Sequence, residues 1–72
     1  MSVSTQIVLL RKEHNITQKE LASGCNLTEI SIQNYESGRR KPSYEALLAL
    51  ADFFAVSIDY LVGRTDKREI NR

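Results

Sequence analysis

The sequence predicts an all-α fold in which five short helices share one core. Three observations lead to this prediction. Apolar residues recur every three or four positions along most of the 72-residue chain, which is the spacing of amphipathic helices. Residues typical of helix starts precede these segments, and Gly or Asn follows several of them. The one run that alternates like a strand, residues 30–33, has no partner strand elsewhere in the sequence.

The first two helices are predicted from one apolar stripe and one capping motif. The stripe of the first helix consists of Val3, Ile7 and Leu10. Ser4 or Thr5 is the expected N-cap of a shortened version of this helix. Thr17 and Glu20 have the spacing of a capping box and therefore begin the second helix. Asn26, which tolerates a left-handed backbone conformation, ends it.

The third helix is predicted from its two ends. Thr28 is the expected N-cap, and Glu29 falls in the first turn, where the helix dipole favours an acid. Gly38 stops the helix, and Pro42 prevents it from continuing. The residues expected to face the core are Ile32 and Tyr35.

The last two helices begin at Ser43 and Ser57. The inward face of the fourth helix is predicted as Tyr44, Leu47, Leu48, Ala51 and Phe54, with Leu50 at its margin. The inward residues of the fifth helix are predicted as Ile58, Leu61 and Val62. Gly63 closes the domain, which spans residues 1–63, and residues 64–72 are expected to form a flexible charged tail with Ile70 as its one apolar residue.

Composition excludes several classes of protein. A chain of 72 residues has room for one domain, and carving an enzyme pocket from it would compromise the core. We find no catalytic constellation and expect no enzyme activity, cofactor, metal or small-molecule ligand, since one Cys and one His cannot form a metal site. Cys25 is expected to be a small buried apolar residue. No segment spans a membrane and no signal peptide is visible, so we expect a cytoplasmic location.

The net charge of +1 conceals an uneven distribution of charge along the chain. Residues 38–42 contain Arg39, Arg40 and Lys41 and no acid, whereas residues 43–63 contain three acids and no base. Residues 64–72 carry a net charge of +2. A short basic run taken alone is often only a solvated loop, so its meaning depends on the neighbouring elements.

Two short helices joined by a tight turn, residues 17–37, are typical of a helix-turn-helix. Ala22 is small enough for two helices to cross closely, and Asn26 suits the turn. The second helix of the pair carries polar residues that can hydrogen-bond outward. In a DNA-binding helix-turn-helix this second helix enters the major groove.

The segments 17–22, 31–42, 47–51 and 56–63 together resemble the phage repressor and Cro type helix-turn-helix family, which is XRE-like. The resemblance runs from about Val3 to Gly63. It implies a five-helix domain that binds double-stranded operator DNA as a transcriptional regulator, usually a repressor acting as a homodimer on a palindromic site. The fifth helix with Tyr60 and the tail is the dimer surface that the family favours, and the apolar pair Val8 and Leu9 is an alternative.

The resemblance also assigns roles to individual positions. Base reading is implied for Thr28, Glu29, Ile30, Gln33 and Asn34. Contact with the DNA backbone is implied for Thr17, Gln18, Ser37, Arg39, Arg40 and Lys41. A buried salt bridge is implied between Arg11 and Glu36.

Three positions depart from the family pattern. Glu29 and Ile30 stand where small polar, amide or basic residues are usual, although Glu can accept from cytosine N4 and Ile can touch a thymine methyl. Asn26 replaces a frequent Gly in the turn, and Ala55 stands where Gly or Asn is common. If φ is positive at Ala55, the Cβ costs on the order of 1 kcal/mol.

A second hypothesis therefore remains open. The chain could be a protein-interaction module, such as an antitoxin or a repressor antagonist, built on the same scaffold. The low net charge and Glu29 favour this alternative slightly. Salt separates the two hypotheses, because DNA binding weakens steeply through counterion release and a protein interface does not.

Overall fold

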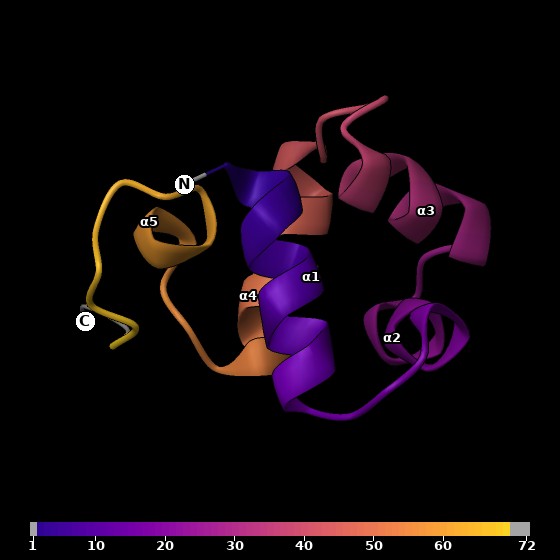
Figure 1. Ribbon diagram of the computed structural model, residues 1–72, viewed down its shortest axis with the longest axis horizontal. Coiled ribbons are helices and arrows are strands. Elements are labelled where there is room, and N and C mark those ends of the chain that lie inside the picture. Colours follow the sequence, from indigo (N-terminus) through magenta and orange to yellow (C-terminus); the bar gives the residue numbers. More distant parts are fainter. Residues whose placement is uncertain (1, 70–72) are drawn as a thin grey trace.

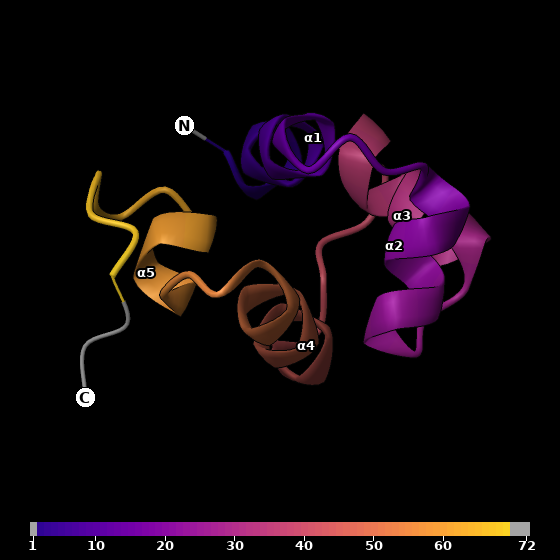
Figure 2. The same cartoon turned by 90° about the horizontal axis from the view of Figure 1, so that it is seen from below.

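A computed structural model describes residues 2–69 and contains five α-helices in that part of the chain (Figure 1). They are α1 (Val3–Glu13), α2 (Gln18–Cys25), α3 (Glu29–Ser37), α4 (Tyr44–Phe54) and α5 (Ile58–Leu61). The predicted all-α fold class is confirmed. The helices form a ring in which α1 packs on α3, α3 on α2, α2 on α4, α4 on α5, and α5 on α1 (Figure 2).

Four helices begin at the predicted N-caps, and the first does not. At Thr17 both bonds of the capping box form, because Thr17 Oγ1 accepts from the Glu20 amide at 3.0 Å and Glu20 Oε1 accepts from the Thr17 amide at 2.9 Å. Helix α1 is capped by Ser2, so the prediction of Ser4 or Thr5 was wrong. Ser2 has extended backbone and its hydroxyl accepts from the Thr5 amide, so the helix begins two or three residues earlier than expected.

Three helices end at a residue with positive φ. Asn26 ends α2 with φ 57°, Gly38 ends α3 with φ 81°, and Ala55 ends α4 with φ 55°. The condition stated for Ala55 is therefore met. This alanine holds a conformation in which its Cβ crowds the following carbonyl.

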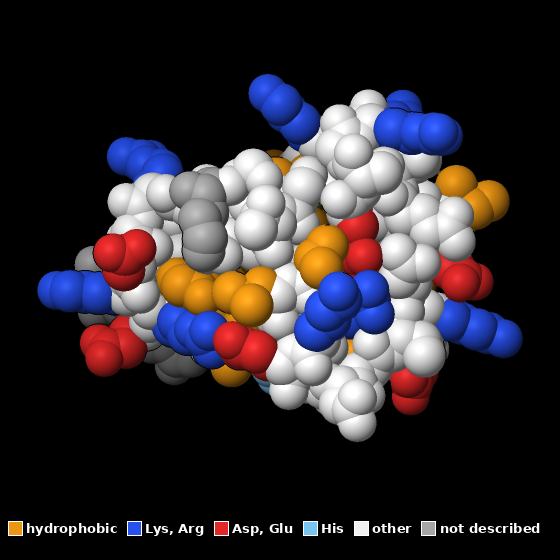
Figure 3. Space-filling model, in the orientation of Figure 1, with side chains coloured by type: hydrophobic (Ala, Val, Ile, Leu, Met, Phe, Trp, Pro, Cys, Tyr) orange, Lys and Arg blue, Asp and Glu red, His pale blue; other side chains and the backbone are white. Residues whose placement is uncertain are grey.

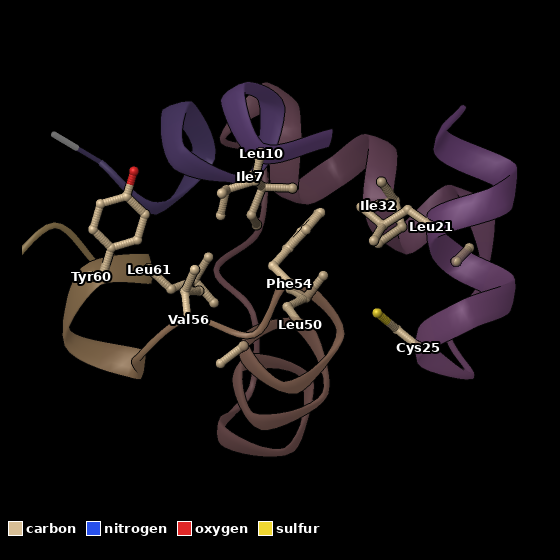
Figure 4. Packing of buried hydrophobic residues seen from close by; sticks show 12 residues of the cluster. Ile7, Leu10, Leu21, Cys25, Ile32, Leu50, Phe54, Val56, Tyr60 and Leu61 are labelled. Carbon is tan, nitrogen blue, oxygen red and sulfur yellow. The ribbon is translucent and has the colours of Figure 1, made fainter. Parts of the chain in front are cut away.

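The core lies inside the ring and draws on all five helices (Figure 4). The fully buried large side chains are Ile7, Leu10, Leu21, Ile32, Leu50 and Leu61. Each comes from a helix too short to be stable alone, so packing around this core holds the helices in place.

The predicted inward face of α4 was partly wrong. Leu50 is fully buried rather than marginal, whereas Tyr44 is 65% exposed and Leu48 is 37% exposed. The buried stripe is instead Ala46, Leu50, Ala51 and Phe54. Apolar residues surround most of α4, so the pattern alone could not choose between neighbouring stripes. The buried stripe is set by α2 and α5, which pack against different sides of α4 (Figure 2).

The predictions for α5 need two corrections. Tyr60, expected on the dimer surface, is buried, and Val62, expected to face inward, is only partly buried. The Tyr60 side chain is covered by the segment that follows α5. Arg68 Nε donates to the Tyr60 hydroxyl at 3.0 Å, and the Arg68 guanidinium lies 5.1 Å from the ring centre.

Residues 64–69 lie against the domain. The Ser57 amide donates to the Arg68 carbonyl at 2.9 Å, and Arg68 pairs with both carboxylate oxygens of Glu13 at 2.8 Å. We call Arg68, Glu13 and Tyr60 the Arg68 cluster. The flexibility predicted for the tail stays a prediction, and Ile70 lies outside the described residues.

Two classes of feature are absent from residues 2–69. No helix there has the length and apolar character that crossing a bilayer requires. No three side chains among His, Cys, Asp and Glu gather as a metal site would need in this part of the chain.

Candidate nucleic-acid interface

Helices α2 and α3 are joined by a turn that brings them into close contact. Asn26 adopts the left-handed conformation, and the Leu27 amide donates to the Ala22 carbonyl at 2.8 Å. Ala22 is 3% exposed, as a small residue at a close helix crossing must be. Cys25 is also buried, and burial raises the pKa of its thiol to about 11, which leaves it protonated and unreactive at neutral pH.

The exposed face of α3 carries polar, acidic and apolar side chains but no basic one. Its exposed residues are Glu29, Ile30, Gln33 and Ser37. None of them is basic, and Ile30 is 68% exposed. These residues fall on one stripe of the helix, and the buried Ile32 lies off it. Side chains on this stripe are free to meet an external surface.

Two of the five residues assigned to base reading lie off this stripe. Thr28 is the N-cap of α3, where its hydroxyl accepts from the Ser31 amide at 3.1 Å and donates to Ser31 Oγ at 2.8 Å. Asn34 is partly buried, and its carbonyl accepts from the Arg40 amide at 3.3 Å. Both residues flank the stripe rather than form it.

Helix α3 is held to the rest of the domain by an ion pair at its C-terminal end. Arg11 donates to the two carboxylate oxygens of Glu36 at 2.6 and 3.1 Å, and the two side chains are 17% and 8% exposed. Arg11 also donates to the Ile16 carbonyl at 3.0 Å. Helix α1 and the loop before α2 are therefore fastened to α3 through one guanidinium.

Gln18 joins this ion pair. Its Nε2 donates to Glu36 Oε1 at 3.0 Å, so one carboxylate links α1, α2 and α3. We call Arg11, Gln18 and Glu36 the Glu36 network. The family resemblance implied that Gln18 contacts the DNA backbone. Its bond to Glu36 could not be anticipated, because residues 18 positions apart show no periodic relation.

Three cations follow α3. Arg39, Arg40 and Lys41 are all exposed, and they begin directly after the left-handed Gly38. Figure 3 shows Lys and Arg side chains that project above the loop between α3 and α4. Ser37 lies next to this loop, and its hydroxyl donates to the Asn34 carbonyl at 3.2 Å. Thr17 is exposed at the start of α2.

The polar outward helix, its rigid attachment and the adjacent cations define a helix-turn-helix of the kind found in DNA-binding proteins. The Helix-turn-helix family model matches residues 7–61. The chain therefore belongs to this family, as the resemblance implied.

Relatives and solved structures agree with this assignment. The chain is 34% identical over 71 residues to the HTH-type transcriptional regulator ImmR of Bacillus subtilis, with 99% of this chain and 56% of ImmR covered. It is 35% identical over 71 residues to the cryptic phage CTXphi transcriptional repressor RstR of Vibrio cholerae, with 96% of this chain and 63% of RstR covered. The chain thus spans little more than half the length of these relatives.

The crystal structure of the P22 c2 repressor in complex with a synthetic operator has the same fold. The two chains are 28% identical and superpose with a TM-score of 0.85, over 90% of this chain and 98% of the repressor chain. The likeness covers all five helices of the described domain.

Proposed function

We propose that this chain is the sequence-specific DNA-binding domain of a transcriptional regulator, and that α3 enters the major groove. The observation that carries the proposal is the polar outward stripe of α3, which the Glu36 network holds rigidly beside three exposed cations. A helix that reads bases needs both the outward stripe and the adjacent cations, because base contacts give specificity and phosphate contacts fix the position on the DNA. The relatives with repressor names and the P22 operator complex support this choice.

The proposed roles follow the position of each residue. Base reading falls to Glu29, Ile30 and Gln33 on the stripe, with Thr28 and Asn34 at its flanks. Backbone contact falls to Thr17, Gln18, Ser37, Arg39, Arg40 and Lys41. A Gln side chain can pair with adenine N6 and N7, so we expect an A·T pair opposite Gln33.

We further propose that the regulator is a repressor that binds a palindromic operator as a homodimer, in the compartment that holds the DNA, the cytoplasm. One recognition helix covers only a few base pairs, so two half-sites about one helical turn apart are needed for useful affinity. The Tyr60 side chain cannot form the dimer surface, because it is buried under Arg68.

A groove between α4 and α5 is a better candidate for the dimer surface. It has a volume of about 330 Å³ and is lined by Leu48, Ala51, Val56 and Ile58, with Asp52 and Asp59 beside them. Leu48 is exposed and Ile58 is partly exposed, so a second copy would cover apolar area here. We expect Ile58→Asp to weaken the binding of two protomers to one operator. For the unaltered protein, sedimentation that gives one protomer per operator would refute the dimer.

The experiment that tests DNA binding is selection of sites from random duplexes, followed by affinity measurements at several salt concentrations. We expect Arg39→Ala to weaken binding to all duplexes alike and to reduce the salt slope by about one. Arg64→Ala is the matched control, because Arg64 is also exposed but follows α5, away from α3. An affinity that does not change between roughly 50 and 200 mM salt would refute the proposal.

The second candidate function is a protein-interaction module. The observation in its favour is the outward stripe of α3, which carries one acid, one exposed Ile and no base. A salt-independent interface that is lost in Ile30→Asp but not in Arg39→Ala would place this function first.

A further inference from the structure

The groove between α4 and α5 has two walls that are held in different ways. One wall belongs to α4, a helix of 11 residues that packs against both α2 and α5. The other wall consists of residues 56–59 and includes the start of α5, a helix of four residues. A single helical turn is too short to be stable alone, so it does not hold its own position. The shape of the groove therefore depends on what holds α5 from its other side.

The other side of α5 is covered by residues 64–69, which we call the strap. Figures 1 and 2 both show α5 between α4 and the strap. The strap is bonded to Ser57, which lines the groove. The Ser57 amide donates to the Arg68 carbonyl at 2.9 Å, while the Ser57 hydroxyl caps α5 by accepting from the Tyr60 amide at 3.0 Å. A shift of the strap therefore displaces the start of α5 and the groove wall with it.

Arg68 is the side chain that fixes the strap. Its guanidinium donates to the Tyr60 hydroxyl and to both carboxylate oxygens of Glu13. Three donors in one plane define an orientation as well as a distance. The side chains of Arg68 and Glu13 are 46% and 38% exposed, so their ion pair contributes little to global stability. What the contact supplies is mainly geometry.

A buried bond from α1 acts on the same helix. Gln6 is 2% exposed, and its Nε2 donates to the Tyr60 carbonyl at 3.1 Å. Helix α5 is thus attached to α1 at two points, through the Tyr60 carbonyl to Gln6 and through the Tyr60 hydroxyl and Arg68 to Glu13. Two separate attachments restrict rotation of α5 about either one.

We propose that the strap preorganises the α5 wall of the groove for the second copy, and that Arg68 is the positioning residue. The inference rests on the proposed function, because it concerns the groove that the second copy is proposed to cover. A wall that is in place before association loses less conformational freedom when the second copy binds. Helix α3 is attached to α1 through the Glu36 network and not through the strap. The strap therefore affects the binding of two protomers without changing how one protomer binds DNA.

The first arm of the test compares a duplex with the complete selected operator and a duplex with one half-site scrambled, at one fixed salt concentration. We expect Arg68→Ala to weaken binding to the complete operator about tenfold, because one side chain in each protomer then has to be immobilised on binding. Binding to the single half-site should not change. Lys67→Ala is the matched control, because it removes the same charge from the strap, where Lys67 bonds through its backbone. It should leave both affinities unchanged.

The second arm tests the pairing of Arg68 with Glu13. Glu13→Arg alone should weaken binding to the complete operator. The double variant Glu13→Arg, Arg68→Glu should bind the complete operator more tightly than either single variant, because the reversed charges can pair in the same place. Effects of two unconnected substitutions would instead add. Additive losses would overturn the positioning role of Arg68.

Amide hydrogen exchange of the free protein measures the groove wall directly. Arg68→Ala should speed exchange at the Ser57 and Tyr60 amides and leave the amides of α3 unchanged. The variant should fold, because the Arg68 side chain is half exposed and lies outside the core, and circular dichroism checks this. Exchange at the α5 amides that does not differ between the variant and the unaltered protein would overturn the proposal.

The outcomes separate this inference from the function on which it rests. An unchanged affinity of Arg68→Ala for the complete operator, or equal losses on both duplexes, would overturn the inference alone. One protomer per operator for the unaltered protein would overturn the dimer and the inference with it. Absence of salt-dependent DNA binding would overturn the proposed function itself.

Discussion

Ala55 ends α4 with φ 55° and ψ 45°, a conformation that suits Gly. The Cβ in this region costs roughly 1–2 kcal/mol, and Gly returns about half of that through its greater freedom in the unfolded chain. We therefore expect Ala55→Gly to raise the free energy of unfolding by about 0.5–1 kcal/mol, measured by urea denaturation.

Asn15 supplies the control for this prediction. It has φ 55° as well, but Asn tolerates the left-handed region through its short polar side chain. Asn15→Gly should therefore gain less than Ala55→Gly. An equal gain at both positions would show that strain at the Ala55 Cβ is not the cause.

Glu36 is a largely buried charge that links three helices. Its side chain is 8% exposed and accepts from Arg11 and Gln18. Glu36→Gln leaves a largely buried guanidinium without its counter-charge, and we expect the free energy of unfolding to fall by about 2–4 kcal/mol. Glu13→Gln should lower the free energy of unfolding much less, because the Glu13 side chain is 38% exposed. Urea denaturation of both variants measures the two losses. Similar losses at the two positions would contradict the role of burial.

The family resemblance implied two members of the Glu36 network, Arg11 and Glu36, but not the third, Gln18. Arg11 and Glu36 were paired on that basis, and the structure places their side chains in contact. The bond from Gln18 could not be anticipated, because it depends on how α2 sits against α3. A sequence states local preferences, whereas contacts between distant residues arise from packing that no local pattern encodes.

At the scale of elements, α2 approaches α4 through Gly24. A Cβ at this position would overlap the ring of Phe53, which is 38% exposed and can turn outward. Gly24→Ala improves helix propensity by roughly 1 kcal/mol, but it displaces the ring and loses that contact. We expect Gly24→Ala to be more favourable by about 1 kcal/mol when Phe53→Ala is also present, measured in a double-mutant cycle. Additive effects would show that the two residues do not compete for space.

Helix boundaries were predictable where a cap and a stop flanked the same segment, as at Thr28 and Gly38. The orientation of α4 was less predictable. Its apolar residues cover more than one stripe, so the packing of α2 and α5 decided that Leu50 points inward and Tyr44 outward. Local signals define where a helix lies in the chain, but a strongly apolar helix needs its neighbours to define which side is buried.

At the scale of the whole molecule, the Arg68 cluster joins two segments that are far apart in sequence. Arg68 donates to both carboxylate oxygens of Glu13 and thereby holds the pKa of Glu13 below its ordinary value of 4.5. A carboxyl with a lowered folded-state pKa stabilises the fold above its unfolded pKa, and this contribution is lost as the pH falls through the folded value.

We therefore expect Glu13→Gln to flatten the loss of stability as the pH falls below 4.5, measured by urea denaturation at a series of pH values. Arg68→Ala should have the same effect. Glu20 serves for comparison, since the Thr17 amide lowers its pKa independently of Arg68. Its acid-dependent contribution should survive in Arg68→Ala, and acid curves that run parallel for all variants would contradict the assignment.

The five-helix all-α class was predictable, because helical spacing held throughout and the predicted caps held for four of the five helices. The path of residues 64–69 was not, since their charged composition also suits a solvated tail and only the contacts with Glu13, Ser57 and Tyr60 bring them back.

The outward stripe of α3 has a consequence for how such proteins diversify. Glu29, Ile30 and Gln33 are exposed, while Ile32 and Glu36 on the same helix hold the fold. Mutations can therefore change the three outward positions one at a time with little loss of folding stability. Under the proposed function, duplicated copies in one genome can acquire separate DNA targets while each remains folded, so they compete less for each other's sites without any change in the scaffold.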